Sequence, residues 1–327
     1  MADIDLAPLT PRARDPLDHV VVVKESGPEE MGLIPITSFL EVDAGVVTLP
    51  VAAVPAAPAA GNLKLFVDNV AGRPMPSFRG PSGLDRVLQP YLARGRFAMA
   101  RPAGNNTAMH VLGMIIASTG TATQANIATT SRHTEMARLE YLVTVAAATA
   151  VAGFRGNAQQ WTIGGAAADR GGFRMSYIWA PATGVTNATH RAFAGMRASV
   201  AAPTDVEPST LTNICGMGWD AADTNVQFMH NDSAGTATKI DLGASFPVPT
   251  VDRTSAYLIE IYAPPGTTQS LSYEITDLVS GAVATGTVTT DLPATSQLLS
   301  HYNYMSVGGT SSVVGIAVMG IAMETDY

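Results

Sequence analysis

The stretch AYLIEIYAPPGTTQSLSYEITDLVSG, residues 256–281, decides the fold class. It contains two strand-like runs, 256–266 and 271–281, that are rich in β-branched and aromatic residues and are separated by a short turn. Such residues favour a pleated, half-buried surface, whereas Pro and Gly are typical of turns. The pattern predicts an antiparallel β-hairpin.

Further strand-like runs occur at 173–180, 225–230 and 312–326, with clusters of Gly, Pro, Asn, Asp and Thr between them. Many short strands at such spacing are typical of a sandwich or barrel. Helices of about ten residues do not alternate with these strands, which argues against a parallel α/β sheet. We therefore predict an all-β protein whose residues 97–327 form an antiparallel, jelly-roll-like β-sandwich.

The segments before residue 97 differ in character. Residues 18–40 read as strand, turn, strand and a short helical end, and VAAVPAAPAAG (51–61) is typical of a semi-rigid linker. We assign residues 1–60 to a small extended N-terminal segment and 61–96 to a connector. Within the connector, GPSGLDRVLQPYLARG (80–95) predicts a short helix that Pro90 interrupts. A segment as small as 1–60 buries little surface, so it needs partners, although a flexible arm with one hairpin also fits.

The composition narrows the class of protein. Charged residues are 14% of 327 and the net charge is −8, while typical domains carry about 25% charged residues. The low charge indicates a surface that is partly covered in an assembly, although a weakly charged monomer also fits. An acidic chain without a basic stripe argues against nucleic acid as a partner. Cys215 is the single cysteine, so an intrachain disulfide is excluded, and we expect a small buried side chain.

No apolar signal core opens the sequence and no run of 18 apolar residues occurs in it. We expect no membrane insertion. A protein that is made in the cytoplasm and works outside the cell leaves by lysis, which is the route of a virion protein.

Motifs of catalysis are missing from the sequence. There is no G-x-S-x-G elbow, Walker loop, G-x-G-x-x-G after a strand, or H-E-x-x-H. Glu260 and Glu274 lie on the two strands of the predicted hairpin, but strand alternation explains them more simply as solvated positions. We expect no enzyme, no cofactor and no metal site. The six histidines lack metal-ligand spacing: His19, His110, His133, His190, His230 and His301.

One polar loop is a candidate binding site, namely residues 219–225 with 230–232 across the next strand. An aromatic ring can stack on the C–H face of a sugar while amides and carboxylates bind its hydroxyls, and the same carboxylates suit calcium. The alternative is an ordinary turn with a core tryptophan. The candidate residues are Trp219, Asp220, Asp223, Asn225, His230, Asn231 and Asp232.

Two stretches, residues 72–107 and 201–247, resemble a family of tailed-bacteriophage virion proteins described as tail fibre or structural proteins. The 18–40 pattern resembles small trimeric units at the N-termini of phage fibres, and residues 216–232 resemble a concanavalin-A-like jelly roll. The resemblance implies a homotrimer that joins other virion proteins through its N-terminus and contacts a host-surface glycan. A capsid or tail decoration protein and a glycan-degrading tailspike are the alternatives.

Overall fold

The computed structural model describes residues 19–21, 33–35, 41–43, 46–56, 58, 64–79, 86–87, 97–167 and 170–325, with side chains from residue 48 onward except those of 86–87. Contacts divide the chain into two units, one of residues 1–69 and 74–89 and the other of residues 70–73 and 90–327. The division falls inside the connector that the sequence places at 61–96. None of the helices in the described ranges is long and apolar enough to cross a membrane.

The first unit contains three small sheets among its described residues. The strands of the first two have three residues each, and an isolated two-stranded hairpin is marginally stable in water. The two strands predicted within residues 18–40 are present as an antiparallel pair, whereas the turn between them and the helical end lie outside the described residues. The pairs are β1 (His19–Val21) with β2 (Leu33–Pro35) and β3 (Glu41–Asp43) with β4 (Val46–Thr48); the third sheet is β5 (Lys64–Val70), β6 (Arg73–Arg79) and β7 (Arg86–Val87).

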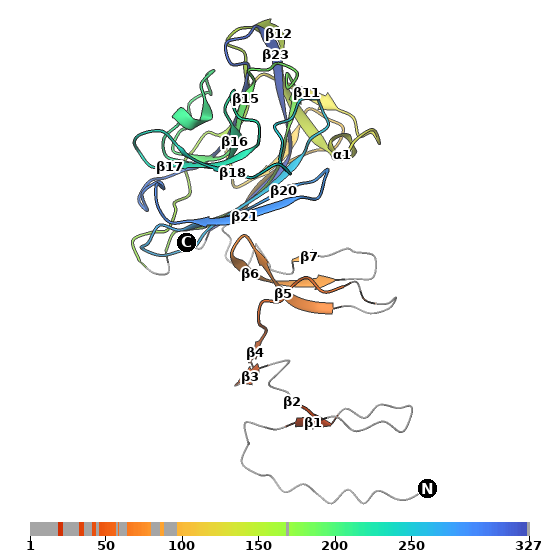
Figure 1. Ribbon diagram of the computed structural model, residues 1–327, viewed down its shortest axis with the longest axis vertical. Coiled ribbons are helices and arrows are strands. Elements are labelled where there is room, and N and C mark those ends of the chain that lie inside the picture. Colours follow the sequence, from red (N-terminus) through yellow and green to blue (C-terminus); the bar gives the residue numbers. More distant parts are fainter. Residues whose placement is uncertain are drawn as a thin grey trace, which may run out of the picture. The chain divides into compact units, whose positions relative to one another are not determined.

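The second unit is a sandwich of two antiparallel sheets, which confirms the predicted fold class (Figure 1). The helical elements described are α1 (Arg132–Glu135) and the 3-10 turn η3 (Pro208–Thr210). The seven-stranded sheet runs in the order β10 (Ile116–Thr119), β13 (Val151–Gly156), β22 (Ser300–Ser306), β15 (Arg191–Arg197), β16 (Ile214–Trp219), β17 (Gln227–Asn231) and β18 (Thr238–Asp241). The nine-stranded sheet runs β11 (Thr121–Ala125), β12 (Arg138–Ala147), β23 (Ser312–Glu324), β14 (Phe173–Thr183), β19 (Tyr257–Ala263), β20 (Leu271–Asp277) and β21 (Val283–Val288), while β8 (Phe97–Pro102) pairs with β23 and β9 (Met109–Leu112).

The core lies between the two sheets, where alternate residues of each strand meet. Trp179 of β14 and Trp219 of β16 have ring centroids 6.0 Å apart. Phe228 of β17 stacks on Tyr273 of β20, with centroids 3.9 Å apart and planes at 12°. Since each contact joins one sheet to the other, the sandwich has a continuous aromatic core of its own.

The hairpin predicted over 256–281 is confirmed as β19 and β20, with Glu260 directly opposite Glu274. The solvated position expected for Glu260 is wrong: its side chain is buried and accepts hydrogen bonds of 2.7 Å from Arg174 Nη2 and Ser176 Oγ. The predicted connector helix is wrong at residues 86 and 87, which pair as β7 with β6. The rest of that helix lies outside the described residues.

A strap, residues 198–213, joins β15 to β16 and covers the outer face of the seven-stranded sheet. Its ends meet through a 3.0 Å hydrogen bond from Ala198 N to Asn213 O. Val206 and Leu211 of the strap pack on a second apolar cluster, and the hydroxyl of Tyr304 donates to the Val206 carbonyl at 2.9 Å. The strap therefore shields from solvent an outer sheet face that many antiparallel sandwiches leave exposed. The cluster beneath it contains Val151, Phe193, Ile214, Met229, Ala237, Tyr302 and Tyr304.

A buried carboxylate ties the start of β12 to the loop before β19. Glu140 forms ion pairs with Arg138 Nε at 3.1 Å and Arg253 Nη2 at 2.8 Å, and His133 Nε2 lies 3.8 Å away. Burial opposes ionisation of Glu140, but hydrogen bonds from His133 and Arg253, with the charges of the arginines, lower its pKa from 4.5 to about 2. Glu140 is therefore ionised at neutral pH and stabilises the fold.

We expect Glu140→Gln to lower the free energy of unfolding by about 3 kcal/mol at pH 7, since it leaves buried Arg138 without its counter-charge. Because the folded pKa lies below the unfolded one, the wild-type advantage is present above pH 4.5 and disappears as pH falls towards 2. Urea denaturation across this range measures it. Glu135→Gln is the control, because the Glu135–Arg132 pair is exposed and its loss should lower the free energy of unfolding by less than about 1 kcal/mol. Equal stability of Glu140→Gln and wild type at pH 7 would contradict the assignment.

Candidate functional site

The polar loop predicted from sequence forms an acidic turn, residues 220–225, between β16 and β17. Asp223 N donates to the Asp220 carbonyl at 3.1 Å, and Asp220 N donates to Asp223 Oδ2 at 2.8 Å. Lys239 Nζ of β18 lies 3.1 Å from Asp220 Oδ2 and 2.5 Å from Asp223 Oδ1. Asn225 Nδ2 donates to Asp241 Oδ2 at 3.2 Å. The turn is therefore rigid, and its two aspartates share one cation.

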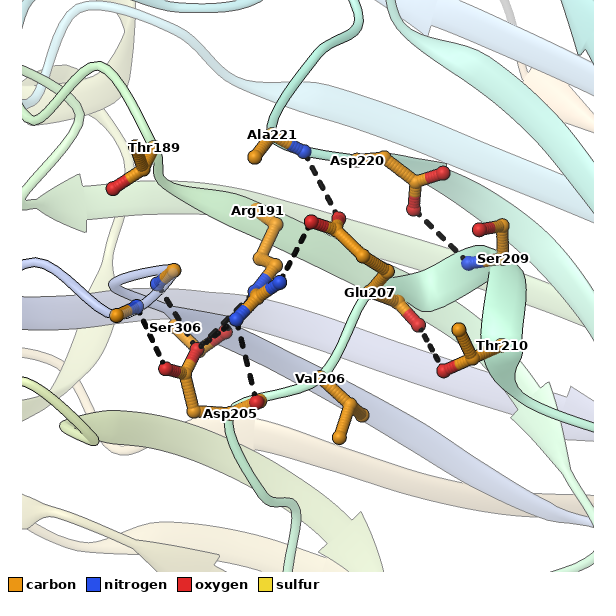
Figure 2. A network of polar contacts seen from close by, with 12 residues as sticks. Thr189, Arg191, Asp205, Val206, Glu207, Ser209, Thr210, Asp220, Ala221 and Ser306 are labelled. Carbon is orange, nitrogen blue, oxygen red and sulfur yellow. Dashed lines mark hydrogen bonds and ion pairs between the residues drawn. The ribbon is translucent and has the colours of Figure 1, made fainter.

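A network of polar contacts fastens the acidic turn to the strap (Figure 2). Glu207 accepts from Ala221 N at 3.0 Å and from Arg191 Nη1 at 2.7 Å. Asp220 Oδ1 accepts from Ser209 N at 3.0 Å. Through Glu207, the loop that the sequence singles out is held by Arg191 on β15.

The other partner of Arg191 is Asp205, at 2.8 Å from Nη2. Asp205 also accepts from the backbone amides of Gly308 and Gly309 at 3.0 and 2.9 Å. Burial alone would raise the Asp205 pKa, but the hydrogen bond from Arg191 and the other donors lower it. The pKa of Arg191 is raised because its two carboxylate partners outweigh its partial burial. Asp205 therefore remains ionised beside the guanidinium.

Trp219 is buried in the core and is not available as a stacking platform for a sugar. Its ring lies 6.0 Å from Trp179 and 5.8 Å from His190, measured between centroids. The binding role expected for Trp219 is therefore replaced by a packing role, which was the alternative. Cys215, four residues earlier on the same face of β16, is fully buried as expected, and burial raises the pKa of its thiol.

The strand register separates the remaining predicted residues from the acidic turn. Gly218 pairs with Gln227 next to the turn, whereas Ile214 pairs with Asn231 at the far end of the β16–β17 hairpin. His230 and Asn231 are buried there: His230 Nδ1 lies 2.9 Å from Asp291 O, and Asn231 Nδ2 donates to Leu211 O at 2.8 Å. Asp232 is exposed at that end. The seven predicted residues therefore do not form one site.

Sequence reasoning missed Lys239, Arg191 and Glu207, which complete the surroundings of the acidic turn. The sequence did mark Lys239 as unusual, because it is the last of only three lysines and the only one after Lys64. The register places it on β18, where Met229 pairs with Lys239. Its pKa is raised because hydrogen bonds to Asp223 and Asp220 outweigh partial burial.

The described residues offer no group of three His, Cys, Asp or Glu side chains that could hold a metal ion. Burial lowers the pKa of His301 to about 3, so this core imidazole is neutral. Glu260 is held by Arg174 and Ser176, and burial raises its pKa. What the acidic turn offers is hydrogen bonding through Asp220, Asp223 and Asn225, which are partly exposed.

No family model matches the chain, and no curated protein matches it. Among solved structures, it is similar to a protein of unknown function from Shewanella oneidensis MR-1, with a TM-score of 0.46 and 13% identity over 70% of this chain and 85% of that one.

Two further structures have lower TM-scores. Peanut lectin gives 0.42 at 12% identity, covering 65% of this chain and 92% of the lectin. The CBM2 module of the evolved Dit of Lactobacillus casei BL23 phage J-1 gives 0.41 at 9% identity, covering 71% and 98%.

Proposed function

We propose that the chain is a trimeric fibre subunit of a tailed-bacteriophage virion. Its N-terminal part attaches it to other virion proteins, and its sandwich contacts a glycan of the host surface. The single observation that carries this proposal is the contrast between the two units. The sandwich has a continuous core, whereas the described strands of the first unit form sheets of only two or three strands.

Sheets this small need partners to be stable, and copies of the same chain are the simplest partners. The described side chains of the first unit include exposed apolar ones, with Val51 and Val54 each 48% exposed and Leu65 58% exposed. Covering them between subunits would remove apolar surface from water. The low charge of the sequence supports the same assembly, and the resemblance of residues 72–107 and 201–247 to phage virion proteins supports its location.

The sandwich supports the binding role through the acidic turn. A rigid scaffold that holds a polar loop suits recognition, since the loop loses little entropy on binding. Single sugar contacts are weak because each hydrogen bond contributes only about 1 kcal/mol in competition with water. Three linked copies would raise the avidity for a dense receptor by roughly 100-fold or more.

The double variant Asp223→Ala with Asn225→Ala tests the acidic turn. We expect adsorption of virions to host cells to fall at least several-fold while particle yield is unchanged, because both substitutions remove partly exposed hydrogen-bonding groups. The control is Asp277→Ala, which removes a carboxylate from the β20–β21 turn and its bonds to Val279 N and Ser280 Oγ. Unchanged adsorption of a correctly folded double variant would show that the acidic turn is not the site.

A decoration protein of the capsid or tail, without receptor role, is the second candidate. The same contrast between the two units fits it, because decoration proteins also assemble through partners. Antibody labelling of intact particles separates the two, since a fibre subunit places the sandwich at the distal end of a fibre and a capsid decoration protein covers the head.

A further inference from the structure

A cavity of about 530 Å³ opens at the end of the sandwich where β14 begins, away from the acidic turn. Its walls come from the loop before β14 and from the loop between β21 and β22. The volume lies within the ~300–1,000 Å³ of small-molecule sites. The lining residues are Thr162, Gly165, Ala166, Arg170, Gly171, Thr295 and Ser296.

Backbone hydrogen bonds hold the first wall in place. Gly165 N donates to Gly266 O at 2.7 Å, and Gly266 N donates back to Arg170 O at 3.0 Å. Gly172 N donates to Thr162 O at 3.1 Å. The β19–β20 loop therefore clamps the chain on both sides of residues 168 and 169, which lie outside the described ones. The described part of this wall is therefore held in place by the protein's own backbone.

Glycine is required in this wall. Gly171 has a φ of +71°, and a Cβ there would overlap the carbonyl of Gly164. Gly165 leaves no room for a Cβ either, since it would lie 2.6 Å from Arg170 O. Only Gly adopts such positions without strain. The close crossing of these chain segments sets the shape of the cavity.

Hydrogen bonds also hold the second wall, the loop between β21 and β22, in place. Gln269 Nε2 donates to Leu292 O at 2.9 Å and to Pro293 O at 2.7 Å, just before the lining residues Thr295 and Ser296. Leu299 N donates to Trp161 O at 2.6 Å, which joins the far end of this loop to the first wall. Both walls are thus anchored to each other and to the sandwich.

The chemistry of the lining favours an anion. Arg170 is exposed, and its guanidinium has no hydrogen bond or ion pair with any residue that the structure describes. Most other sandwich arginines are engaged, including Arg138, Arg174, Arg191 and Arg253. None of the lining residues that the structure describes is acidic, in a chain whose net charge is −8. A guanidinium fork binds a carboxylate or phosphate with two parallel hydrogen bonds.

The remaining lining groups suit a sugar. Thr295 and Ser296 supply hydroxyls that both donate and accept, while Ala166 and the glycine backbone present a small apolar surface. We propose that this cavity binds a saccharide unit that carries an anionic group, with Arg170 as the partner of the anion. The inference rests on the proposed contact with a surface glycan, and it places a second contact at the opposite end of the sandwich from the acidic turn.

Titration calorimetry of the full-length chain with glucuronate, glucose 6-phosphate and glucose tests the proposal. We expect saturable binding of glucuronate or of glucose 6-phosphate that is at least tenfold tighter than the binding of glucose. The anionic sugar that binds more tightly shows whether the site prefers a carboxylate or a phosphate. Arg170→Ala should weaken this binding at least tenfold, and Arg170→Lys should restore part of it as a point charge without the fork. Arg101→Ala is the matched control, because Arg101 is an exposed arginine on β8 outside the cavity.

Absence of saturable binding of either anionic sugar to the wild-type chain would overturn the proposal, and so would an Arg170→Ala variant that binds as tightly as wild type. Gly171→Ala gives an independent check, since its Cβ displaces the wall; it should abolish binding while circular dichroism shows the sandwich folded. Binding of glucuronate by a chain that never touches host cells would defeat the fibre proposal and leave the cavity assignment standing. If the wild-type chain bound no anionic sugar and Arg170→Ala left host attachment unchanged, the cavity assignment would be wrong and the fibre proposal would stand.

Discussion

A chain that begins at residue 61 folds into the sandwich but is not incorporated into virions, and it no longer forms the trimer. This is the largest effect that we expect. The second unit contains every strand from β8 to β23 and the core between its sheets. The shortened chain also keeps Arg73, whose guanidinium lies 2.8 Å from Glu324 at the end of β23. What it loses are β1 to β4, the short strands that need partners.

Three measurements check this expectation. Thermal denaturation should show a cooperative transition for the shortened chain, light scattering at micromolar concentration should give a trimer for the full chain and a monomer for the shortened one, and purified particles should lack the shortened chain. A shortened chain that fails to fold, or one that still enters particles, would contradict the division of roles. A full-length chain that is a stable monomer would contradict the trimer.

Trp219→Ala lowers the free energy of unfolding by about 3–5 kcal/mol, which is the range for removing a large aromatic side chain from a core. Trp219 is fully buried and joins the two sheets through Trp179. The void that remains would be lined by the rings of Trp179 and His190, which now pack against the indole. Any loss of host adsorption by this variant would follow from unfolding and not from a lost sugar contact.

Urea denaturation of the full-length variants measures the effect. Val145→Ala is the control, since Val145 is 76% exposed and its truncation should change stability by less than about 0.5 kcal/mol. A Trp219→Ala chain as stable as wild type that adsorbs poorly would restore the binding role first expected for this residue.

The sequence was sufficient to predict the hairpin and the strands at 173–180, 225–230 and 312–326, because these depend on local pattern, whereas the other strands of the sandwich were not predicted. Residues 271–275 alternate between buried and half-buried positions, as expected for a strand, and β20 pairs with β19, the preceding strand along the chain. Distant pairing is different. β14 lies between β19 and β23, and β23 is more than a hundred residues further along the chain. Nothing local in the sequence specifies such a neighbour.

The candidate site was predicted only in part for the same reason. The acidic turn follows from its own residues, Asp220 and Asp223, but its partners Arg191 and Glu207 come from β15 and the strap. For Trp219 a usable signal was present: Cys215, Met217 and Trp219 alternate along β16, which places all three on one buried face. Glu260 gave no such signal, because its partner Arg174 lies on β14, far away in sequence.

Competition for the host surface tests whether the sandwich contacts a receptor on host cells. Host cells are incubated with the purified full-length chain at micromolar concentration, and the adsorption of intact virions is then counted. A fibre subunit that carries the receptor-contacting sandwich should occupy the receptor and reduce adsorption at least tenfold, whereas the Asp223→Ala, Asn225→Ala double variant should protect the cells less. Undiminished adsorption, with no labelled chain retained on the cells, would contradict the account.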